Sequence, residues 1–361
     1  MRKLFLFLAL LGGNIAFAQE NIVVEKLVFT ETVDKAYTSD IPHITDRAGG
    51  QNQITRKIND AIQERFMLES FDPKSVTEFR WYDVEFEHQM KESVLHIAFR
   101  GEYYGAYPNQ IKESLYFDLK TGNQLEEKRI PFHALFSPEG YFDFLNKYWL
   151  PGCSEAYQEA IRCADSEPYC NCYDIEFGCG AGILNLSLTN DCFPHATRAC
   201  SPDVAKRVAL DTAKPFLSSF GKYVLLEARY GQMPRLEQFL FYRKQFQKIP
   251  NYCFAVGSID KKYPFDMALR LPDDGTDKVT GYYFYEKKKI KIPLSGTVNG
   301  QQIALVEKVD GKITGRFQLT WHSEYQQEGI AVGEKYLTGT WTNAQTGKTV
   351  KILFRDIRQN K

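Results

Sequence analysis

The first half of the chain combines a helical and an extended period of hydrophobic residues. Ile54, Ile58, Ile62 and Phe66 recur every four residues between polar positions, which predicts one face of an amphipathic helix. Four extended runs are predicted as strands, over 21–38, 79–86, 93–104 and 115–119. Because the helix needs an apolar surface to pack on, we expect an α+β domain with helices packed on an antiparallel sheet.

Further helices are predicted in the middle of the chain. Tyr141, Phe142 and Leu145 share one helical face, and Pro151-Gly152 after them predicts where that helix ends. Ser201-Pro202-Asp203 has the cap-and-proline pattern of another helix start.

The pattern changes near residue 275. Short apolar runs then recur about every ten residues, and turns that contain glycine separate most of them. The runs predicted as strands are 281–285, 290–294, 303–307, 313–319, 336–341 and 349–354. Such spacing predicts a C-terminal all-β antiparallel meander, either a sandwich or a lipocalin-like barrel. The expected domains are a signal peptide over 1–18, an α+β domain over 19–227, a linker region over 228–275 and a β domain over 276–361.

The first 18 residues have the pattern of a secretory signal peptide. Arg2 and Lys3 precede the apolar run Leu4–Leu11, which is too short to span a bilayer, and Ala16-Phe17-Ala18 is a small-residue cleavage site. We therefore expect cleavage after Ala18 and a periplasmic or secreted protein with no transmembrane segment in its mature chain.

Eight cysteines are candidates for disulfides, because an even number in an exported chain favours cross-links. They are Cys153, Cys163, Cys170, Cys172, Cys179, Cys192, Cys200 and Cys253. Only one residue separates Cys170 from Cys172, which is a poor spacing for zinc, so we expect no metal. Cys192 and Cys200 would close a short loop around Pro194-His195-Ala196, although the sequence alone leaves the pairing open.

Composition and charge narrow the classes of protein. Of the 361 residues, 43% are hydrophobic and 25% are charged, which are ordinary globular values. Forty-five basic residues balance 45 acidic ones, so no nucleic-acid partner is expected. The charges are unevenly distributed along the chain. Residues 276–361 include 14 basic and eight acidic residues, whereas residues 19–275 include 29 basic and 37 acidic ones. An acidic first domain favours a cationic partner.

The sequence contains no recognisable enzyme signature. It has no His-Glu-x-x-His, no Gly-x-Ser-x-Gly and no phosphate-binding glycine loop ending in Gly-Lys-Ser/Thr. Its six histidines are scattered, and carboxylates this numerous form close pairs by chance. We therefore expect no catalytic residue and no cofactor.

Several short motifs in the first domain occur in an order that resembles a known family. They are Ile41–Thr45, Ile58–Ile62, Gly101–Pro108, Tyr116–Gly122, Leu186–Leu188 and Pro194-His195-Ala196. From Asn21 to Leu225 the chain resembles the extracytoplasmic α+β module of lysozyme-sensing anti-sigma factors. The same module, a domain family of unknown function, precedes the catalytic domain of some peptidoglycan deacetylases.

The resemblance implies a surface that recognises a cell-wall glycan or a lysozyme-like protein. Many relatives have histidine where this chain has Tyr107. We expect neither the anti-sigma nor the deacetylase role to carry over, because no transmembrane helix precedes the motifs and no deacetylase domain follows them. In the C-terminal domain, the spacing in Leu337-Thr-Gly-Thr-Trp341 resembles that of lipocalin-like barrels.

Tyr103, Tyr104 and Tyr107, with Asn109, are candidate ligand-binding residues. Flat aromatic faces suit sugars and protein hot spots, because they bury area at little entropic cost. The alternative is structural, since tyrosine is common in strands beside a bulge.

His195 and Arg198 are candidates in the loop between two cysteines. A histidine there either contacts a ligand or, more commonly, shapes the turn. The basic run Lys287–Lys289 with Lys291 either touches an anionic surface or is a solvated hairpin turn.

Together these features favour an exported, non-enzymatic binding protein for a cell-wall glycan or a lysozyme-like protein. One alternative is a cell-envelope hydrolase with an unrecognised carboxylate or His195 site, and another is a structural envelope protein. A concave pocket with convergent carboxylates would favour the hydrolase, whereas a flat tyrosine surface without one would favour binding.

Overall fold

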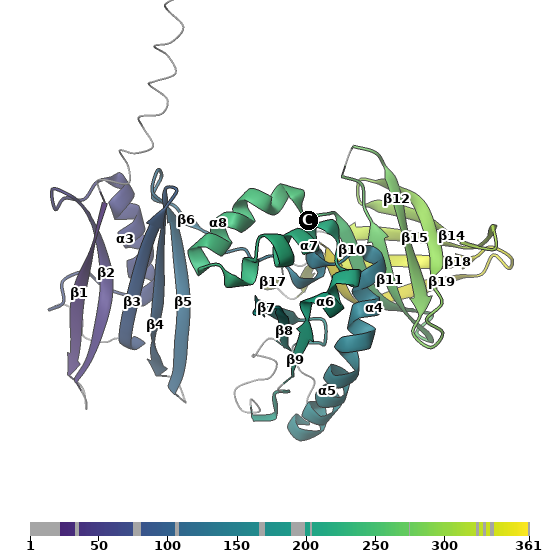
Figure 1. Ribbon diagram of the computed structural model, residues 1–361, viewed down its shortest axis with the longest axis horizontal. Coiled ribbons are helices and arrows are strands. Elements are labelled where there is room, and N and C mark those ends of the chain that lie inside the picture. Colours follow the sequence, from purple (N-terminus) through teal and green to yellow (C-terminus); the bar gives the residue numbers. More distant parts are fainter. Residues whose placement is uncertain are drawn as a thin grey trace, which may run out of the picture. The chain divides into compact units, whose positions relative to one another are not determined.

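The computed structural model describes residues 22–32, 36–74, 81–104, 108–165, 170–188, 199–202, 204–273, 275–322, 325–327, 330–332 and 336–359. These residues form two compact units (Figure 1). The first unit takes the residues up to Arg129 together with Arg235–Leu240, and the second takes Ile130–Pro234 and the residues from Phe241 onward. Within the described ranges, no helix is both long and apolar enough to cross a membrane.

The first unit is built from antiparallel strands and one long helix. Its elements are β1 (Ile22–Thr32), β2 (Ala36–Asp46), α3 (Gln53–Phe66), β3 (Trp81–Lys91), β4 (Val94–Tyr104), β5 (Pro108–Asp118) and β6 (Gln124–Leu125). β1 and β2 form a hairpin, and β3-β4-β5-β6 form a sheet in chain order. Ile58 and Ile62 of α3 share a core with Ile44 of β2 and Ile97 of β4, which confirms the predicted apolar face of the helix.

Asn59 fixes α3 against β2. Its buried amide oxygen accepts a hydrogen bond from the Ile44 backbone N–H at 2.8 Å, and its amide nitrogen donates to the Ile44 carbonyl at 2.8 Å. The side chain thereby satisfies both backbone groups of one strand residue, as a neighbouring strand would.

Helix α8 (Arg235–Gln245) contributes its first six residues to this unit. The Tyr116 ring stacks between those of His96 and Phe239, at centroid distances of 4.6 and 4.2 Å. Arg235 donates to both carboxylate oxygens of Glu127, at 3.0 and 2.8 Å. Part of the region that the sequence predicts as a linker is therefore an ordered helix.

The second unit begins with helices and a small sheet. The elements are α4 (Pro138–Tyr148), α5 (Leu150–Ala164), β7 (Ile175–Gly180), β8 (Ile183–Leu188), β9 (Ala205–Ala209), α6 (Leu210–Ala213) and α7 (Ser219–Lys222). The helix through Tyr141 and Leu145, α4, ends at Tyr148, just before Pro151-Gly152 as predicted. The sequence does not predict that a second helix, α5, begins at once, with Pro151 in its first turn, where no proline N–H is needed. The helix predicted to start at Ser201 is replaced by β9, which pairs with β8.

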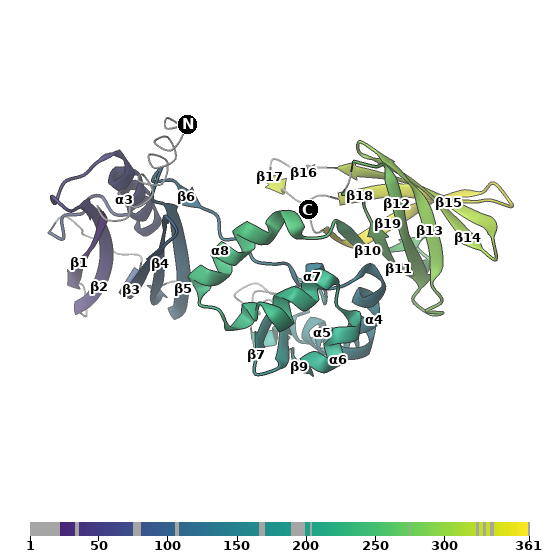
Figure 2. The same ribbon diagram turned by 45° about the horizontal axis from the view of Figure 1, so that its top comes forward.

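The rest of the unit is a closed antiparallel barrel (Figure 2). Its strands in order are β10 (Tyr252–Ile259), β11 (Tyr263–Arg270), β12 (Lys278–Tyr285), β13 (Ile292–Asn299), β14 (Gln302–Val309), β15 (Lys312–His322), β18 (Tyr336–Asn343) and β19 (Thr349–Gln359). Pairing of β10 with β19 closes it, so the predicted meander is a barrel and not a sandwich. The short strands β16 (Tyr325–Gln327) and β17 (Ile330–Val332) pair separately.

Strand β10 is buried on both of its faces. Cys253 and Ala255 belong to the core inside the barrel, whereas Phe254 and Val256 share a core with Tyr141 of α4. A strand buried on both faces lacks polar alternation, which explains why the sequence pattern places it in a linker.

Disulfides cross-link the helical part of the second unit. Cys153 is bonded to Cys172 and Cys163 to Cys200, and Cys170 is also disulfide-bonded. The loop predicted from a Cys192–Cys200 bond is therefore not formed by Cys200; Cys192 itself lies outside the described residues.

Two of the predicted disulfide cysteines are instead free thiols. Cys179 packs in the helical core and Cys253 inside the barrel, where each is surrounded by apolar side chains. Burial raises the pKa of both thiols, that of Cys253 to about 12, so both behave as small apolar core residues.

Candidate functional site

A cavity of about 630 Å³ opens at one end of the barrel. Three hairpin turns surround it, namely those that join β10 to β11, β12 to β13 and β18 to β19. We call it the barrel-mouth cavity. Its volume lies within the range of small-molecule sites, about 300–1,000 Å³.

Three aromatic rings line this cavity: Tyr263, Tyr285 and Trp341. Tyr263 is 56% exposed, and its ring meets that of Tyr285 edge-on, at a centroid distance of 6.2 Å. Because the rings come from three different strands, barrel closure is what gathers them. Together with the apolar Ile259 and Val350, they supply flat contact area for a ligand.

A buried carboxyl group holds the aromatic wall in place. The Glu307 side-chain oxygen Oε2 accepts hydrogen bonds from the Tyr283 hydroxyl at 2.5 Å and from Trp341 Nε1 at 3.2 Å. The Tyr283 hydroxyl is also hydrogen-bonded to that of Tyr285, at 3.3 Å. Burial and the bond to Glu307 raise the pKa of Tyr283, which keeps it a neutral donor. The wall is therefore fixed before any ligand arrives.

A β-bulge leaves room for this network. The register between β14 and β15 shifts after Glu307, which lies opposite Gly315. A Cβ atom on Gly315 would come within 2.3 Å of Trp341 Nε1 and 2.6 Å of Glu307 Cδ. Only glycine fits at this point of the strand.

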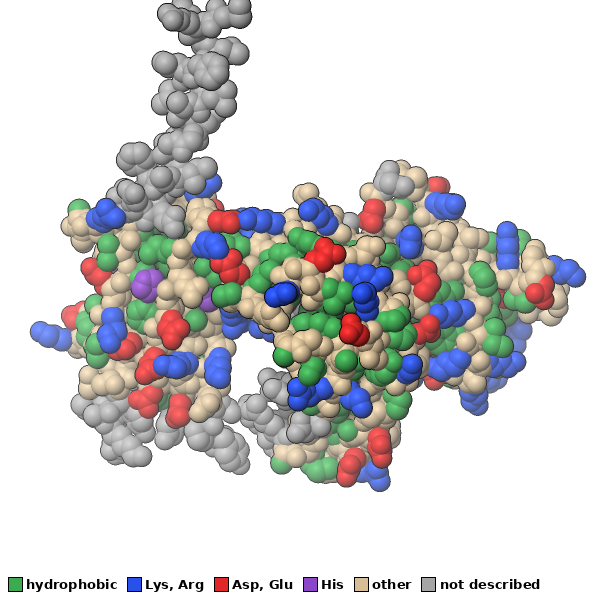
Figure 3. Space-filling model, in the orientation of Figure 1, with side chains coloured by type: hydrophobic (Ala, Val, Ile, Leu, Met, Phe, Trp, Pro, Cys, Tyr) green, Lys and Arg blue, Asp and Glu red, His purple; other side chains and the backbone are tan. Residues whose placement is uncertain are grey.

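The rim of the cavity is basic. Lys262, Lys287, Lys288 and Lys348 line it, against the single carboxylate of Asp260. Figure 3 shows Lys and Arg side chains frequent over the barrel strands on the face that it draws. A rim with this excess of positive charge favours an anionic ligand.

The predicted basic run is divided between two roles. Lys287 and Lys288 line the cavity, but Lys291 donates to the Asp143 carboxylate at 2.7 Å and to the Glu139 carbonyl at 3.0 Å. Lys289 also donates to Asn146 of α4, at 2.8 Å, so half of the run attaches the barrel to α4 and the run is not simply a solvated turn.

A second cavity of about 540 Å³ lies between α4, α5 and the outer face of the barrel. We call it the charged cleft. Asp266 is on its floor, and the ion pair of Glu286 with Arg355, at 2.8 Å, is on its lining. Among the residues that the structure describes, no group of three or more His, Cys, Asp or Glu side chains is arranged to hold a metal ion.

The residues that the sequence predicts for ligand binding stay untested. Tyr103 and Tyr104 are on β4 and Asn109 is on β5, but their side chains are outside the description, as are Tyr107 and all of the 189–198 segment. That segment contains His195 and Arg198.

Sequence reasoning missed the barrel mouth as a site. Two of its parts carried a signal, the Leu-x-Gly-x-Trp motif that ends at Trp341 and the lysine run at 287–289. Nothing in either segment indicates that they meet, since they are joined only through closure of the barrel.

Comparisons with known proteins give no identity. No family model matches the sequence, and no curated protein matches it. One solved structure that matches in part is a member of the DUF3298 family from Bacteroides fragilis, at 13% identity over 55% of this chain and 93% of that one. Its TM-score of 0.22 is too low to show a shared fold.

Proposed function

We propose that this chain is an exported binding protein whose barrel-mouth cavity recognises an anionic cell-wall glycan. The observation that carries this proposal is the combination of a pre-formed aromatic wall with a lysine rim in one cavity. Aromatic faces stack on the apolar faces of sugar rings, and lysines pair with carboxylate or phosphate groups.

The architecture supports a binding role. A closed eight-stranded barrel is just wide enough to be filled by side chains or to hold one small ligand, as lipocalins do. Here Phe265, Met267 and Phe317 fill the interior, so a ligand would occupy the mouth alone. Fold-level analogy does not fix the ligand, which is why the proposal rests on the lining residues.

Export is supported by the cross-links. Disulfides persist in oxidising compartments, and Cys153–Cys172 and Cys163–Cys200 are formed. Together with the signal-peptide pattern of residues 1–18, they support a site outside the cytoplasm, where cell-wall glycans are found.

Titration calorimetry of residues 19–361 with two soluble glycans tests this function. The first is a peptidoglycan fragment whose muramic acid residues carry free carboxylates. The second is a chitin oligosaccharide of the same length, which has no carboxylates. We expect the muramic-acid glycan to bind more tightly, because only its carboxylates can pair with the lysine rim. If neither glycan binds, the proposal is contradicted.

Charge reversal at the rim sharpens the test. Lys288→Glu and Lys348→Glu should each weaken binding of the acidic glycan about tenfold or more, whereas Lys312→Glu, outside the cavity lining, should not. A lysozyme column run in parallel tests the alternative partner. Retention of lysozyme with no glycan binding would move the function to protein recognition, and release of new reducing ends would indicate the hydrolase.

A further inference from the structure

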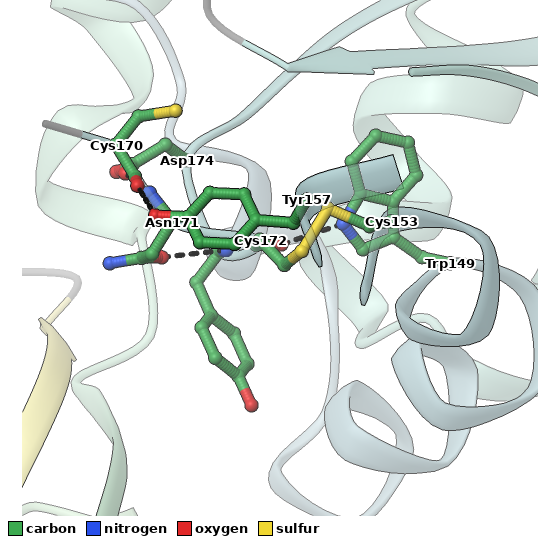
Figure 4. The surroundings of a disulfide bond; sticks show 8 residues. Trp149, Cys153, Tyr157, Cys170, Asn171, Cys172 and Asp174 are labelled. Carbon is green, nitrogen blue, oxygen red and sulfur yellow. Dashed lines mark hydrogen bonds between the residues drawn. A yellow bond between two sulfur atoms is a disulfide. The ribbon is translucent and has the colours of Figure 1, made fainter. Parts of the chain in front are cut away.

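The charged cleft has rigid walls. Figure 4 shows how the Cys153–Cys172 disulfide ties the turn that carries Asn171 to helix α5. The Trp149 indole N–H donates to the Cys172 carbonyl at 2.6 Å, and the Asn171 backbone N–H donates to Asp174 at 2.7 Å. The turn is therefore held from the helix side by a covalent bond and a buried tryptophan.

The barrel side of the same turn is held by an arginine. Arg358 donates to the carboxylates of Asp174 and Asp356, at 2.7 Å each, and thereby joins the turn to β19. One guanidinium group is therefore shared between two carboxylates. Val256 of β10 is the register partner of both Asp266 on β11 and Asp356 on β19. Because paired residues point to the same face of a sheet, the two carboxylates flank Val256 on the cleft floor.

Within the described part of the chain, Asp266, unlike Asp356, lacks a hydrogen-bond donor for one of its carboxylate oxygens. Its side chain is 2% exposed, and its Oδ1 atom has no hydrogen-bond partner among the described residues. Its Oδ2 atom is 3.9 Å from Lys289 Nζ, which itself donates to Asn146 at 2.8 Å. A buried polar atom without a partner is costly and rare in folded proteins, so a missing donor is expected in the cleft.

We propose that the charged cleft is a binding site for a small organic cation, whose primary ammonium group donates to Oδ1 of Asp266. The site is separate from the barrel-mouth cavity and does not depend on its function. Leu150, Pro151 and Val256 line the cleft beside the carboxyl group and would contact a compact carbon skeleton.

Charge selects a cation for this site. Asp266, Glu286 and Asp356 line the cleft with Lys289 and Arg355, and Arg358 behind them is shared between Asp356 and Asp174 of the adjoining turn, which makes four carboxylates against three cations. With all four carboxylates ionised, the three cations leave one negative charge uncompensated, which a monocation would balance. A neutral hydroxyl could satisfy Oδ1 but would leave that charge unbalanced.

Binding of the cation should depend on pH. The pKa of Asp266 is raised to about 7, because burial and the nearby Glu286 outweigh the opposing effects of Lys289, Asn146 and Arg355. Tyr173 also faces the site, but burial raises its pKa far above neutrality, so it does not titrate here. Asp356 accepts a hydrogen bond from Arg358 at 2.7 Å.

Cyclohexylamine and its neutral analogue cyclohexanol are the probes for this site. The amine stays cationic across the tested range, so any pH effect belongs to the protein. We expect the amine to bind residues 19–361 about 30-fold more tightly at about pH 8.5 than at about pH 5.5, since the ionised fraction of Asp266 changes by that factor. Cyclohexanol should bind at least tenfold more weakly at the higher pH.

Variants separate this site from the barrel mouth. Asp266→Asn should abolish binding of the amine, whereas Asp310→Asn, in an exposed barrel turn, and Lys288→Glu should leave it unchanged. Equal binding of the two probes, a flat pH profile of the wild type, or retained binding in Asp266→Asn would each overturn the proposal. If that variant does not fold, the two probes on the wild type decide alone.

Discussion

Glu307 and Asp266 are both buried carboxyl groups of the barrel, and their surroundings differ. Glu307 accepts hydrogen bonds from Tyr283 and Trp341, whereas Asp266 has Lys289 on one oxygen and an unpartnered second oxygen. A buried carboxyl group whose hydrogen bonds are made, such as Glu307, stabilises the residues around it. A buried carboxyl group with one oxygen that no described residue donates to, such as Asp266, is harder to ionise, so its pKa is raised.

Asp266 should make stability depend on pH. Its pKa is about 7 in the folded protein and close to 4 in an unfolded chain, so its favourable contribution is present below about pH 4 and lost as pH rises through about 7. Asp266→Asn removes this loss. Relative to the wild type, the free energy of unfolding of the variant should rise by up to about 4 kcal/mol between about pH 4 and pH 8.

Urea unfolding followed by tryptophan fluorescence measures this difference. Trp149, Trp321 and Trp341 all belong to the second unit, so the signal reports mainly on it. Asp310→Asn serves as the control and should show no such dependence. Parallel pH profiles for Asp266→Asn and the wild type would contradict the expected titration.

The sequence predicts helices and strands that expose one face to solvent, but not those that are buried on both faces. The helix through Ile58 and the strand through Ile97 each bury one face, so their hydrophobic periods are visible in the sequence. β10 buries Phe254 outside the barrel and Ala255 inside it, which removes the period. Helix α5 is missed for another reason, since proline occurs in a first helical turn as well as after a last one, and Pro151 is interpreted only as the end of α4.

The bulge between β14 and β15 should tolerate only glycine at position 315. Gly315→Ala would place a methyl group against Trp341 and Glu307, so we expect it to destabilise the second unit by about 2–4 kcal/mol. It should also weaken binding of the acidic glycan, because the wall loses its support. Gly178→Ala on β7, where a Cβ meets nothing within 4 Å, is the matched control. Equal melting temperatures for both variants would mean that the bulge tolerates a side chain.

At the scale of the whole molecule, both cavities are assembled from distant segments. The barrel mouth needs Tyr263, Lys288 and Trp341 together, and only the β10–β19 pairing brings them to one end of the barrel. The charged cleft joins the disulfide-bonded turn to three barrel strands. Their residue types were visible in the sequence, but their proximity was not, because each segment alone carries an ordinary pattern.

Which cysteines are free and which are disulfide-bonded tests whether this is an exported, cross-linked protein. Cys179 and Cys253 are buried thiols with raised pKa values, so neither should react with iodoacetamide while the mature protein is folded. In denaturant without reductant, both should be alkylated, because unfolding restores their solvent access and ordinary pKa. Cys153 and Cys163 should be alkylated only after reduction. Mass spectrometry of the peptides reads out each position, and alkylation of Cys153 or Cys163 before reduction would contradict both the disulfides and the oxidising compartment that they imply.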